Sequence, residues 1–435
     1  MSPGLSPRPI KVQWWHSPAL LILGFTLPFF LLVAAITPSV IRNAPVLASR
    51  EMYLTLFRVI QAISLLLVFA AGAAYAGRKT FIGKVQLYDG CMDFLFYLTF
   101  AAYIIWFGPL VLSNPRLILE TFTGTVGAIY DVRDEAQNIS GVTTATQFGI
   151  SYAIIYAIKR FQDGEIVPRK YTIMLGIIGG LALFRATVYS ERIAVAEIFI
   201  AAFVIFVVSY QSRKRYVRLG IKYFPFLLYA AAPIFFAVFE YPRSWLNHYI
   251  DIYDNFWHFV MDRFSLYYVT SLNNICALLD YSQNPTYDGG WTLNWLYRFP
   301  VIGPLLSDAG ANGGGVGHSW FLKFLAAYAS PEFNNTTGVL TVVYDWGWPL
   351  GLVLMGIYGI LAGLTFASFK SGNGVLRYVY PIFLYSILEL LRIGYIYDGR
   401  AVAAIIGIII AIGFWRKAAA MAPPMTMAPG GLRPR

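Results

Sequence analysis

Cysteine, histidine and charge are all scarce in this chain. The 435 residues include two cysteines and four histidines, and only 13% are Asp, Glu, Lys or Arg. The two cysteines, Cys91 and Cys276, fall on segments that we assign below to opposite faces of a membrane, so they cannot pair with each other. The sequence offers no disulfide framework and no metal-ligand cluster, and we expect neither a metal nor a cofactor.

Common ligand-binding motifs are missing as well. No basic domain interleaved with aromatic residues occurs, so we expect no nucleic-acid partner despite the net charge of +11. The glycine-rich segment DAGANGGGVGHSW (308–320) lacks the GK[ST] of a nucleotide-binding P-loop. We interpret this segment as a flexible lid that places His318.

Apolar residues are what the chain has in excess. They make up 58% of the sequence, and they form repeated runs of about 17 to 24 residues, enough to cross ~30 Å of hydrocarbon. We therefore predict an all-α, polytopic integral membrane protein with about ten transmembrane helices. The predicted spans are 18–40, 54–76, 92–112, 144–159, 171–188, 192–210, 221–240, 338–369, 377–396 and 400–415. We expect the first to be retained rather than cleaved as a signal, although VAAITPS loosely resembles a cleavage site.

The distribution of Lys and Arg in the loops predicts the orientation, because positively charged loops stay in the cytoplasm. One side of the predicted topology carries 20 of the 33 cations, including all but one of the lysines. Both termini fall on this side and are predicted to be cytoplasmic. The net positive charge is mostly this retention signal.

The same topology divides the chain into four parts. Residues 1–240 form an N-terminal membrane bundle of about seven helices, and 241–336 form a large outer loop that is partly helical. Residues 337–417 supply about three further membrane helices. The remaining segment, 418–435, has the composition of a disordered cytoplasmic tail.

The long outer loop is polar and rich in aromatics. It holds three of the four histidines, five of the eleven tryptophans and nine tyrosines. Aromatic faces mixed with carboxylates and amides can stack against sugar rings, although such residues also pack at the bilayer interface. Within the loop, MDRFSLYYVTSLNNICALL (261–279) predicts an amphipathic helix near the membrane that carries Arg263.

Arginine dominates the cations of the outer side. Of the thirteen that we assign there, only Lys323 is a lysine. The planar guanidinium grips phosphate oxygens in a bidentate manner, so this bias suits a phosphorylated lipid substrate, with headgroup anchoring as an equal alternative for any one arginine. Arg185 and Arg192 stand out because they flank the hairpin RATVYSER at the outer ends of two spans, where a buried charge needs a partner.

Further ionisable groups lie within or near predicted spans. Glu197 falls in the sixth span, and Glu389 and Arg392 are one helical turn apart in the ninth. An internal ion pair between helices and a polar pocket reached from outside are equally compatible with this second pair.

Three segments of the chain carry a family resemblance. They are RATVYSERIA (185–194), SGVTTATQFG (140–149) and NNTTGVLTVVYDWGWPLGLVLMGIYGILAG (334–363). These segments, the number of spans and the large loop before the last segment resemble Wzy-type oligosaccharide repeat-unit polymerases, the O-antigen polymerase-like family. The order of predicted spans and loops is similar over most of the chain, and the amino-acid sequence itself is similar over about 55 residues.

The resemblance implies an enzyme of surface polysaccharide or exopolysaccharide synthesis, embedded in the bacterial inner membrane. Such a glycosyltransferase-type polymerase moves a growing chain from undecaprenyl pyrophosphate onto an incoming lipid-linked unit at the periplasmic face. Its partners would be undecaprenyl-pyrophosphate-linked oligosaccharides and membrane lipid, with a chain-length regulator and a flippase as possible protein partners.

The mechanism that fits is metal-independent glycosyl transfer. Arginines would neutralise the developing pyrophosphate charge, with Arg192 as first choice and Arg185, Arg263 and Arg392 after it. A base near the acceptor hydroxyl would be Asp345, His318 or Glu191. Asp345 is equally explained as a helix-start residue, since a glycine and a proline follow it closely.

Other functions remain open at this point. A lipid-linked glycan ligase would use similar arginine and histidine chemistry on a different acceptor. A transferase that uses polyprenyl-phosphate sugars is less favoured, because the first outer loop, NAPVLASREMY, offers only Glu51 in place of an acidic pair. A transporter or flippase for lipid-linked sugars would favour an internal repeat, and none is evident between the two halves.

Overall fold

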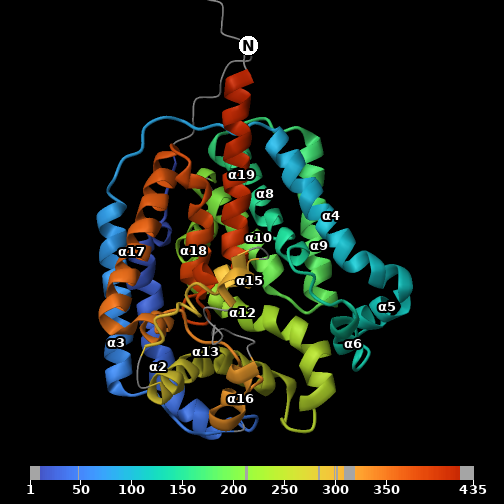
Figure 1. The fold of residues 1–435 in the computed structure, drawn as a ribbon, viewed down its shortest axis with the longest axis vertical. Coiled ribbons are helices and arrows are strands. Elements are labelled where there is room, and N and C mark those ends of the chain that lie inside the picture. The colour runs from blue at the N-terminus through green and yellow to red at the C-terminus, as the bar shows by residue number, and fades with distance from the viewer. Residues whose placement is uncertain are drawn as a thin grey trace, which may run out of the picture.

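The structure is a computed structural model that describes residues 10–47, 49–210, 214–282, 285–297, 299, 302–307 and 319–421. Within these ranges every regular element is helical (Figure 1). The α-helices are α1 (Pro18–Leu21), α2 (Leu27–Asn43), α3 (Leu56–Ala76), α4 (Gly90–Ser113), α5 (Pro115–Thr123), α6 (Ala128–Glu135), α7 (Val142–Ala145), α8 (Phe148–Ala157), α9 (Arg169–Val188), α10 (Ile193–Ser209), α11 (Arg215–Lys222), α12 (Phe224–Glu240), α13 (Phe256–Tyr281), α14 (Asn294–Tyr297), α15 (Ile302–Ser307), α16 (Ser319–Tyr328), α17 (Thr341–Ser371), α18 (Tyr380–Glu389) and α19 (Gly399–Met421). Short π-helical segments at Ile22–Thr26, Ile158–Gln162 and Tyr241–Tyr249 extend α1, α8 and α12, respectively.

Six helical stretches are long and apolar enough to cross a membrane. They are Pro18–Asn43, Leu56–Ala76, Gly90–Ser113, Arg169–Val188, Phe224–Tyr249 and Thr341–Ser371. The prediction of an all-helical membrane protein is confirmed for the described part of the chain. Of the other four predicted spans, 192–210 and 400–415 correspond to the shorter apolar stretches Ile193–Ser209 and Gly399–Phe414. The spans 144–159 and 377–396 contain the ten-residue helices α8 and α18.

The closest helix pairing joins the second and the eighth predicted spans, α3 and α17. A Cβ atom on Gly359 would lie 2.2 Å from the carbonyl oxygen of Phe69, and one on Gly363 would lie 2.5 Å from that of Ala73. Only glycine allows this approach, and small residues that bring backbones together are a common means of helix association in membranes. The pairing fixes the segment 334–363 against the N-terminal half of the chain.

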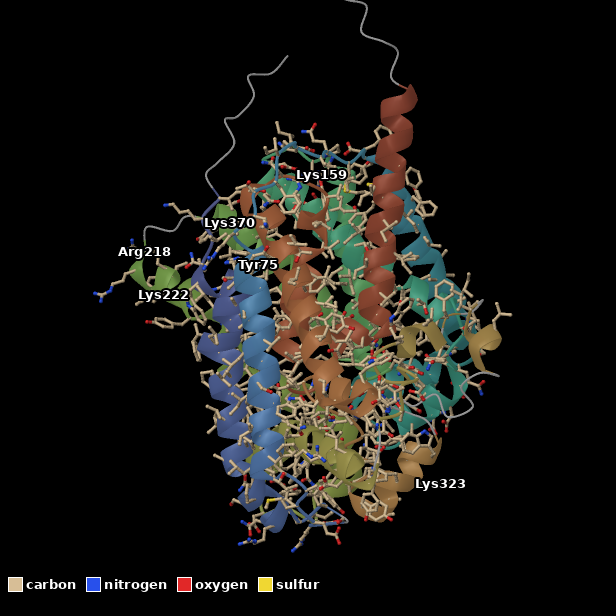
Figure 2. The ribbon with its side chains drawn as sticks, turned by 60° about the vertical axis from the view of Figure 1, so that its left-hand side comes forward. Tyr75, Lys159, Arg218, Lys222, Lys323 and Lys370 are labelled. Atoms are coloured by element: carbon tan, nitrogen blue, oxygen red, sulfur yellow. The ribbon has the colours of Figure 1, made fainter. Side chains whose placement is uncertain are left out.

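Lysines mark one end of the helix bundle. Lys159, Lys222 and Lys370 lie near this end, whereas Lys323 on α16 lies at the opposite end (Figure 2). Contacts between distant segments agree with this picture, because Trp14 near the start of the chain donates to the carbonyl of Lys222 at the end of α11. We refer to the two as the lysine-rich end and the opposite end.

The predicted helix 261–279 is present within α13. Its apolar residues Leu266, Val269 and Ile275 are buried, and the helix packs against α2, α12 and α17. Neighbouring helices therefore cover its apolar face, and the helix carries Arg263 into the protein.

Helix α17 is interrupted near its start. Gly347 has a φ of 74° and a ψ of 168°, which break the helix two residues after Asp345. A positive φ favours glycine, and Pro285 packs against this point, 3.1 Å from where a Cβ would stand. At the other end of the chain, α19 continues to Met421, and the rest of the predicted tail, 422–435, lies outside the described residues.

Candidate functional site: an arginine and glutamate network

The hairpin between α9 and α10 brings three charged residues to the opposite end of the bundle. Arg185 lies in the last turn of α9, and Glu191 and Arg192 lie just before α10 begins at Ile193. The hairpin is tight, and Ser190 adopts a φ of 59° to make the turn. The side chain of Arg185 is almost fully buried, with an exposed fraction of 5%.

One half of the network is centred on Glu191. Its Oε2 accepts from the Nε of Arg185 at 2.5 Å and from an Nη of Arg400 at 2.7 Å. Arg400, at the start of α19, also pairs with Glu197 at 3.2 Å, and Glu197 in turn accepts from Tyr395 at 2.9 Å. Ion pairs thereby connect three helices, α9, α10 and α19.

Residues of the SGVTTATQFG segment complete this half. An Nη of Arg185 donates to the Thr146 hydroxyl at 2.7 Å. Oriented to satisfy both neighbours, the Gln147 amide donates to Glu197 at 3.2 Å and accepts from Arg185 at 3.0 Å. Gln147 then closes a ring in which each member contacts two others. The members are Arg185, Glu191, Arg400, Glu197 and Gln147.

Glu191 is held in its ionised form. Burial of its carboxyl favours protonation, but the neighbouring Arg400 and Arg185 outweigh this effect and lower its pKa. A carboxylate with a lowered pKa is a poor proton acceptor. The geometry therefore favours a charge-balancing role for Glu191 over the predicted role of base.

The other half of the network is centred on Glu240, at the end of α12. Its side chain is fully buried, with an exposed fraction of 0%. Oε1 lies 2.9 Å from an Nη of Arg192 and 3.4 Å from one of Arg243, and Oε2 lies 2.7 Å from the Nε of Arg263. Arg263 also donates to Glu332 at 2.5 Å. Three arginines thus converge on one carboxylate.

The contacts at Glu240 are close but poorly aligned for hydrogen bonding. The Nη1 of Arg192, the Nε of Arg263 and the Oε2 of Glu240 are buried and lack a hydrogen-bond partner of good geometry among the described residues. Coulombic attraction is therefore satisfied here while hydrogen-bonding capacity is left over. Both donors face the Glu240 carboxylate, so another acceptor gains them only when Glu240 moves aside.

Positive charge exceeds negative charge across the two halves. The network contains five arginines (Arg185, Arg192, Arg243, Arg263 and Arg400) and four glutamates (Glu191, Glu197, Glu240 and Glu332). A sixth arginine, Arg133 on α6, donates to the carbonyl of Tyr189 in the hairpin at 3.2 Å. Burial and the nearby Arg243 lower the pKa of Arg133, as expected beside uncompensated positive charge.

The structure brings together three of the four arginines predicted to bind pyrophosphate. Arg192 and Arg263 share Glu240, and Arg185 joins them through the hairpin. Arg392 lies elsewhere, where its Nε donates to Glu389 at 2.7 Å. The local ion pair that the sequence allowed between these two residues is therefore present.

The predicted bases are dispersed. Asp345 is fully buried, and its Oδ2 accepts from the backbone of Trp291 at 3.1 Å and from the backbone and hydroxyl of Thr292, each at 2.7 Å. The carboxylate therefore bonds to the backbone of the outer loop. The sequence had instead allowed a role at the start of its own helix. His318 lies outside the described residues.

Sequence reasoning missed several members of the network. Glu240 ends an otherwise apolar helix, and a carboxylate in such a position is a functional candidate in its own right. Glu332 and Arg400 carried no such signal, because their roles depend on contacts between distant segments. Outside the network, burial raises the pKa of the Asp262 carboxyl, which accepts from Tyr253 at 2.5 Å.

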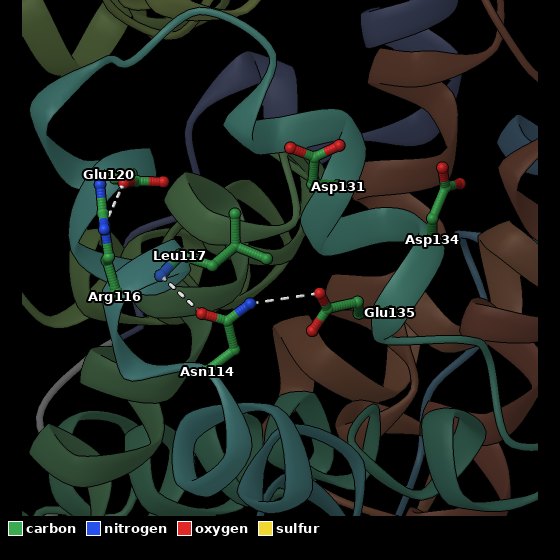
Figure 3. A pocket seen from close by; sticks show the side chains of 7 residues that line it. All are labelled: Asn114, Arg116, Leu117, Glu120, Asp131, Asp134 and Glu135. Atoms are coloured by element: carbon green, nitrogen blue, oxygen red, sulfur yellow. Dashed lines mark hydrogen bonds and ion pairs between the residues drawn. The ribbon is translucent and has the colours of Figure 1, made fainter.

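A separate acidic hollow lies on α5 and α6. It has a volume of about 380 Å³ and is lined by Asn114, Arg116, Leu117, Glu120, Asp131, Asp134 and Glu135 (Figure 3). Its contacts are local, since Arg116 pairs with Glu120 and Asn114 bonds to Glu135. Within the described part of the chain, no group of three or more His, Cys, Asp or Glu side chains is arranged to hold a metal ion.

No protein-family model matches the chain, and comparisons with curated proteins and with solved structures find no significant match.

Proposed function

We propose that this chain is a glycosyltransferase-type polymerase that joins lipid-linked oligosaccharide repeat units at the periplasmic face of the bacterial inner membrane. The observation that carries the proposal is the buried arginine network, which has an excess of positive charge and unused hydrogen-bond donors. Buried arginines at the end of a helix bundle suit a pyrophosphate group carried by a membrane lipid.

The position of the resembling segments also supports the proposal. RATVYSERIA supplies Arg185, Glu191 and Arg192, and SGVTTATQFG supplies Thr146 and Gln147 to the same ring of contacts. In the third segment, the backbone of Thr337 donates to the carbonyl of Ser271 on α13, the helix that carries Arg263. Segments far apart in the sequence thus meet around one group of charges.

The proposed reaction requires a particular membrane topology. The chain crosses the membrane about ten times, both termini and the lysine-rich end are cytoplasmic, and the arginine network faces the periplasm. Residues 241–336 form the periplasmic loop that receives the oligosaccharides. A flippase would deliver the undecaprenyl-pyrophosphate-linked units to this face, and a chain-length regulator would act on the product.

The proposed reaction needs charge neutralisation and one proton acceptor. The acceptor hydroxyl oxygen forms a bond to the anomeric carbon of the growing chain, and the bond from that carbon to the pyrophosphate oxygen breaks. Arg192 and Arg263 turn from Glu240 to the leaving pyrophosphate, with Arg185 beside them, and stabilise its charge. Arg392 is left to its ion pair with Glu389.

We take Asp262 as one candidate, beside Asp345 and His318, to receive the proton from the acceptor hydroxyl. Its raised pKa places its proton affinity closer to neutral pH than that of Glu191, whose pKa is lowered. In this role, Asp262→Asn should abolish chain transfer while pyrophosphate affinity is retained. Retained transfer would leave Asp345 and His318 as the candidates.

The test in cells is gel analysis of surface and lipid-linked glycans from a strain that lacks this chain. Complementation uses the wild type, Arg192→Ala and the matched control Arg116→Ala, which removes an exposed arginine at the same end of the bundle. A polymerase predicts single repeats in the deletion strain, rescue by the wild type and Arg116→Ala, and no rescue by Arg192→Ala at equal protein level. Full-length chains stranded on the lipid carrier would instead indicate a ligase, and an unchanged ladder would leave transport.

A further inference from the structure

Ser190 combines an unfavourable backbone conformation with a buried hydroxyl that lacks a hydrogen-bond partner among the described residues. Its φ of 59° lies in the left-handed region that favours glycine, and its side chain is buried, with an exposed fraction of 6%. Its hydroxyl has no hydrogen-bond partner among the described residues. Backbone strain and a buried unsatisfied hydroxyl each destabilise a fold, and here both fall on one residue.

Glycine or alanine in place of Ser190 would remove one or both of these destabilising features. Glycine at this position would relieve the backbone, and either glycine or alanine would remove the unsatisfied hydroxyl. Local penalties of this kind persist where the surrounding structure imposes them, and they concentrate at binding sites. A ligand that accepts from the hydroxyl would offset one of the two.

The neighbours of Ser190 hold it at the junction of the two halves of the network. The carbonyl of Tyr189, on one side, accepts from the Nε of Arg133. On the other side, Glu191 is bound by two arginines, and Arg192 reaches Glu240. The hydroxyl is therefore carried by a turn whose two flanking residues both contact arginines, and these guanidinium groups attract an anion.

We propose that the Ser190 hydroxyl is a binding group that donates a hydrogen bond to a phosphate oxygen of the pyrophosphate held by the arginine network. The inference rests on the proposed function, since it assigns a further contact to that same anion. Arginines supply charge, whereas a neutral hydroxyl on a strained turn supplies direction, because its position is fixed before the ligand arrives. Both a phosphate oxygen and the Glu240 carboxylate pair with the arginines, but only the phosphate oxygen also accepts from the Ser190 hydroxyl.

Three variants of the full-length chain test this role. Ser190→Ala removes the hydroxyl and keeps the Cβ, and Ser190→Gly removes both the hydroxyl and the strain. Ser386→Ala is the matched control, because Ser386 is equally buried but its hydroxyl donates to the carbonyl of Ile382 at 2.8 Å. For each, thermal unfolding without ligand and the dissociation constant for inorganic pyrophosphate are measured on purified protein.

The inference predicts opposite signs for stability and binding. Without ligand, Ser190→Ala should unfold at or above the wild-type temperature and Ser190→Gly should unfold higher still, while both bind pyrophosphate about tenfold more weakly. Ser386→Ala should be less stable and bind normally. The weakening should also be seen with a polyprenyl pyrophosphate in nanodiscs, and weakening confined to inorganic pyrophosphate would contradict a lipid-borne substrate.

Two results would overturn the inference alone. They are wild-type pyrophosphate affinity in Ser190→Ala, or a loss of stability in that variant without ligand, since the latter would mean that the fold already satisfies the hydroxyl. A wild-type chain that fails to bind either pyrophosphate probe would overturn the proposed function together with the inference.

Discussion

Two buried clusters of charge lie at opposite ends of the molecule, and they differ in what the arginines hold. At the lysine-rich end, Arg377 is fully buried and makes a bidentate pair with Asp163, with both distances 2.9 Å. It also donates to the backbone carbonyls of Gly372 at 2.7 Å and Val85 at 2.6 Å. This guanidinium fastens together three loops, those between α3 and α4, between α8 and α9, and between α17 and α18.

At the opposite end, the arginines hold side chains. Arg192, Arg263 and Arg400 contact glutamates and a tyrosine hydroxyl, and none of these three donates to a backbone carbonyl among the described contacts. A backbone carbonyl in a packed loop cannot leave its partner without moving the loop, whereas a glutamate side chain can rotate away. The comparison teaches that Arg377 is tied to the backbone of its neighbours, whereas the contacts of these three arginines are made with side chains that can rotate.

The largest expected effect is the loss of Arg377. Arg377→Ala leaves the buried Asp163 carboxylate without its bidentate partner and frees two backbone carbonyls. Breaking a buried ion pair costs about 3–5 kcal/mol, so the variant should be poorly folded. Thermal unfolding in detergent and the yield of monodisperse protein measure this. A variant of normal stability would erase the difference between the two clusters.

Next in size is a change at Arg192 that keeps the charge. Arg192→Lys should lower the polymerisation rate by on the order of 100-fold, because an ammonium cannot form the bidentate grip on a phosphate. Its stability should change little, since a lysine can still balance Glu240. The rate is measured by chain lengthening at equal protein level. Normal polymer length would remove Arg192 from the site.

Acidification provides a third and smaller test. The folded pKa of Glu191 is lowered by Arg400 and Arg185, so its stabilising contribution is complete above the unfolded pKa of about 4.3 and is lost as the pH falls through the lower folded value. The unfolding temperature of the wild type should therefore fall with acid more steeply than that of Glu191→Gln, while the two curves run parallel near pH 7. Equal acid sensitivity would contradict the clamped carboxylate.

The smallest effect is expected at Asp345. Asparagine keeps one oxygen that can accept from Trp291 and Thr292, so Asp345→Asn should polymerise within a few-fold of the wild type, as expected for a capping residue. Asp345→Ala removes the acceptor and should destabilise the outer loop, detected by faster limited proteolysis. A severe loss of activity in Asp345→Asn with normal proteolysis would instead point to a catalytic proton acceptor.

The sequence predicted the parts of the network whose signals are local. Arg185 and Arg192 flank one hairpin, and the preference for arginine over lysine on one side is visible in the composition. The spacing of Glu389 and Arg392 allowed an ion pair as one of two alternatives, and the structure contains that pair.

Partners from distant segments could not be predicted in this way. Glu240 meets Arg192 and Arg263 only because α10, α12 and α13 converge, and no periodicity within one helix encodes that convergence. Helix lengths show the same limit. The six candidate membrane helices were evident from hydropathy, whereas the bounds of the others depend on packing.

The most direct test of the account is lengthening of a lipid-linked repeat unit by the purified chain in nanodiscs, compared between wild type and Arg192→Lys at equal folded protein. The account predicts a ladder of products with the wild type and unreacted single repeats with Arg192→Lys. No lengthening by the wild type in the presence of the substrate, or an identical ladder from both proteins, would contradict it.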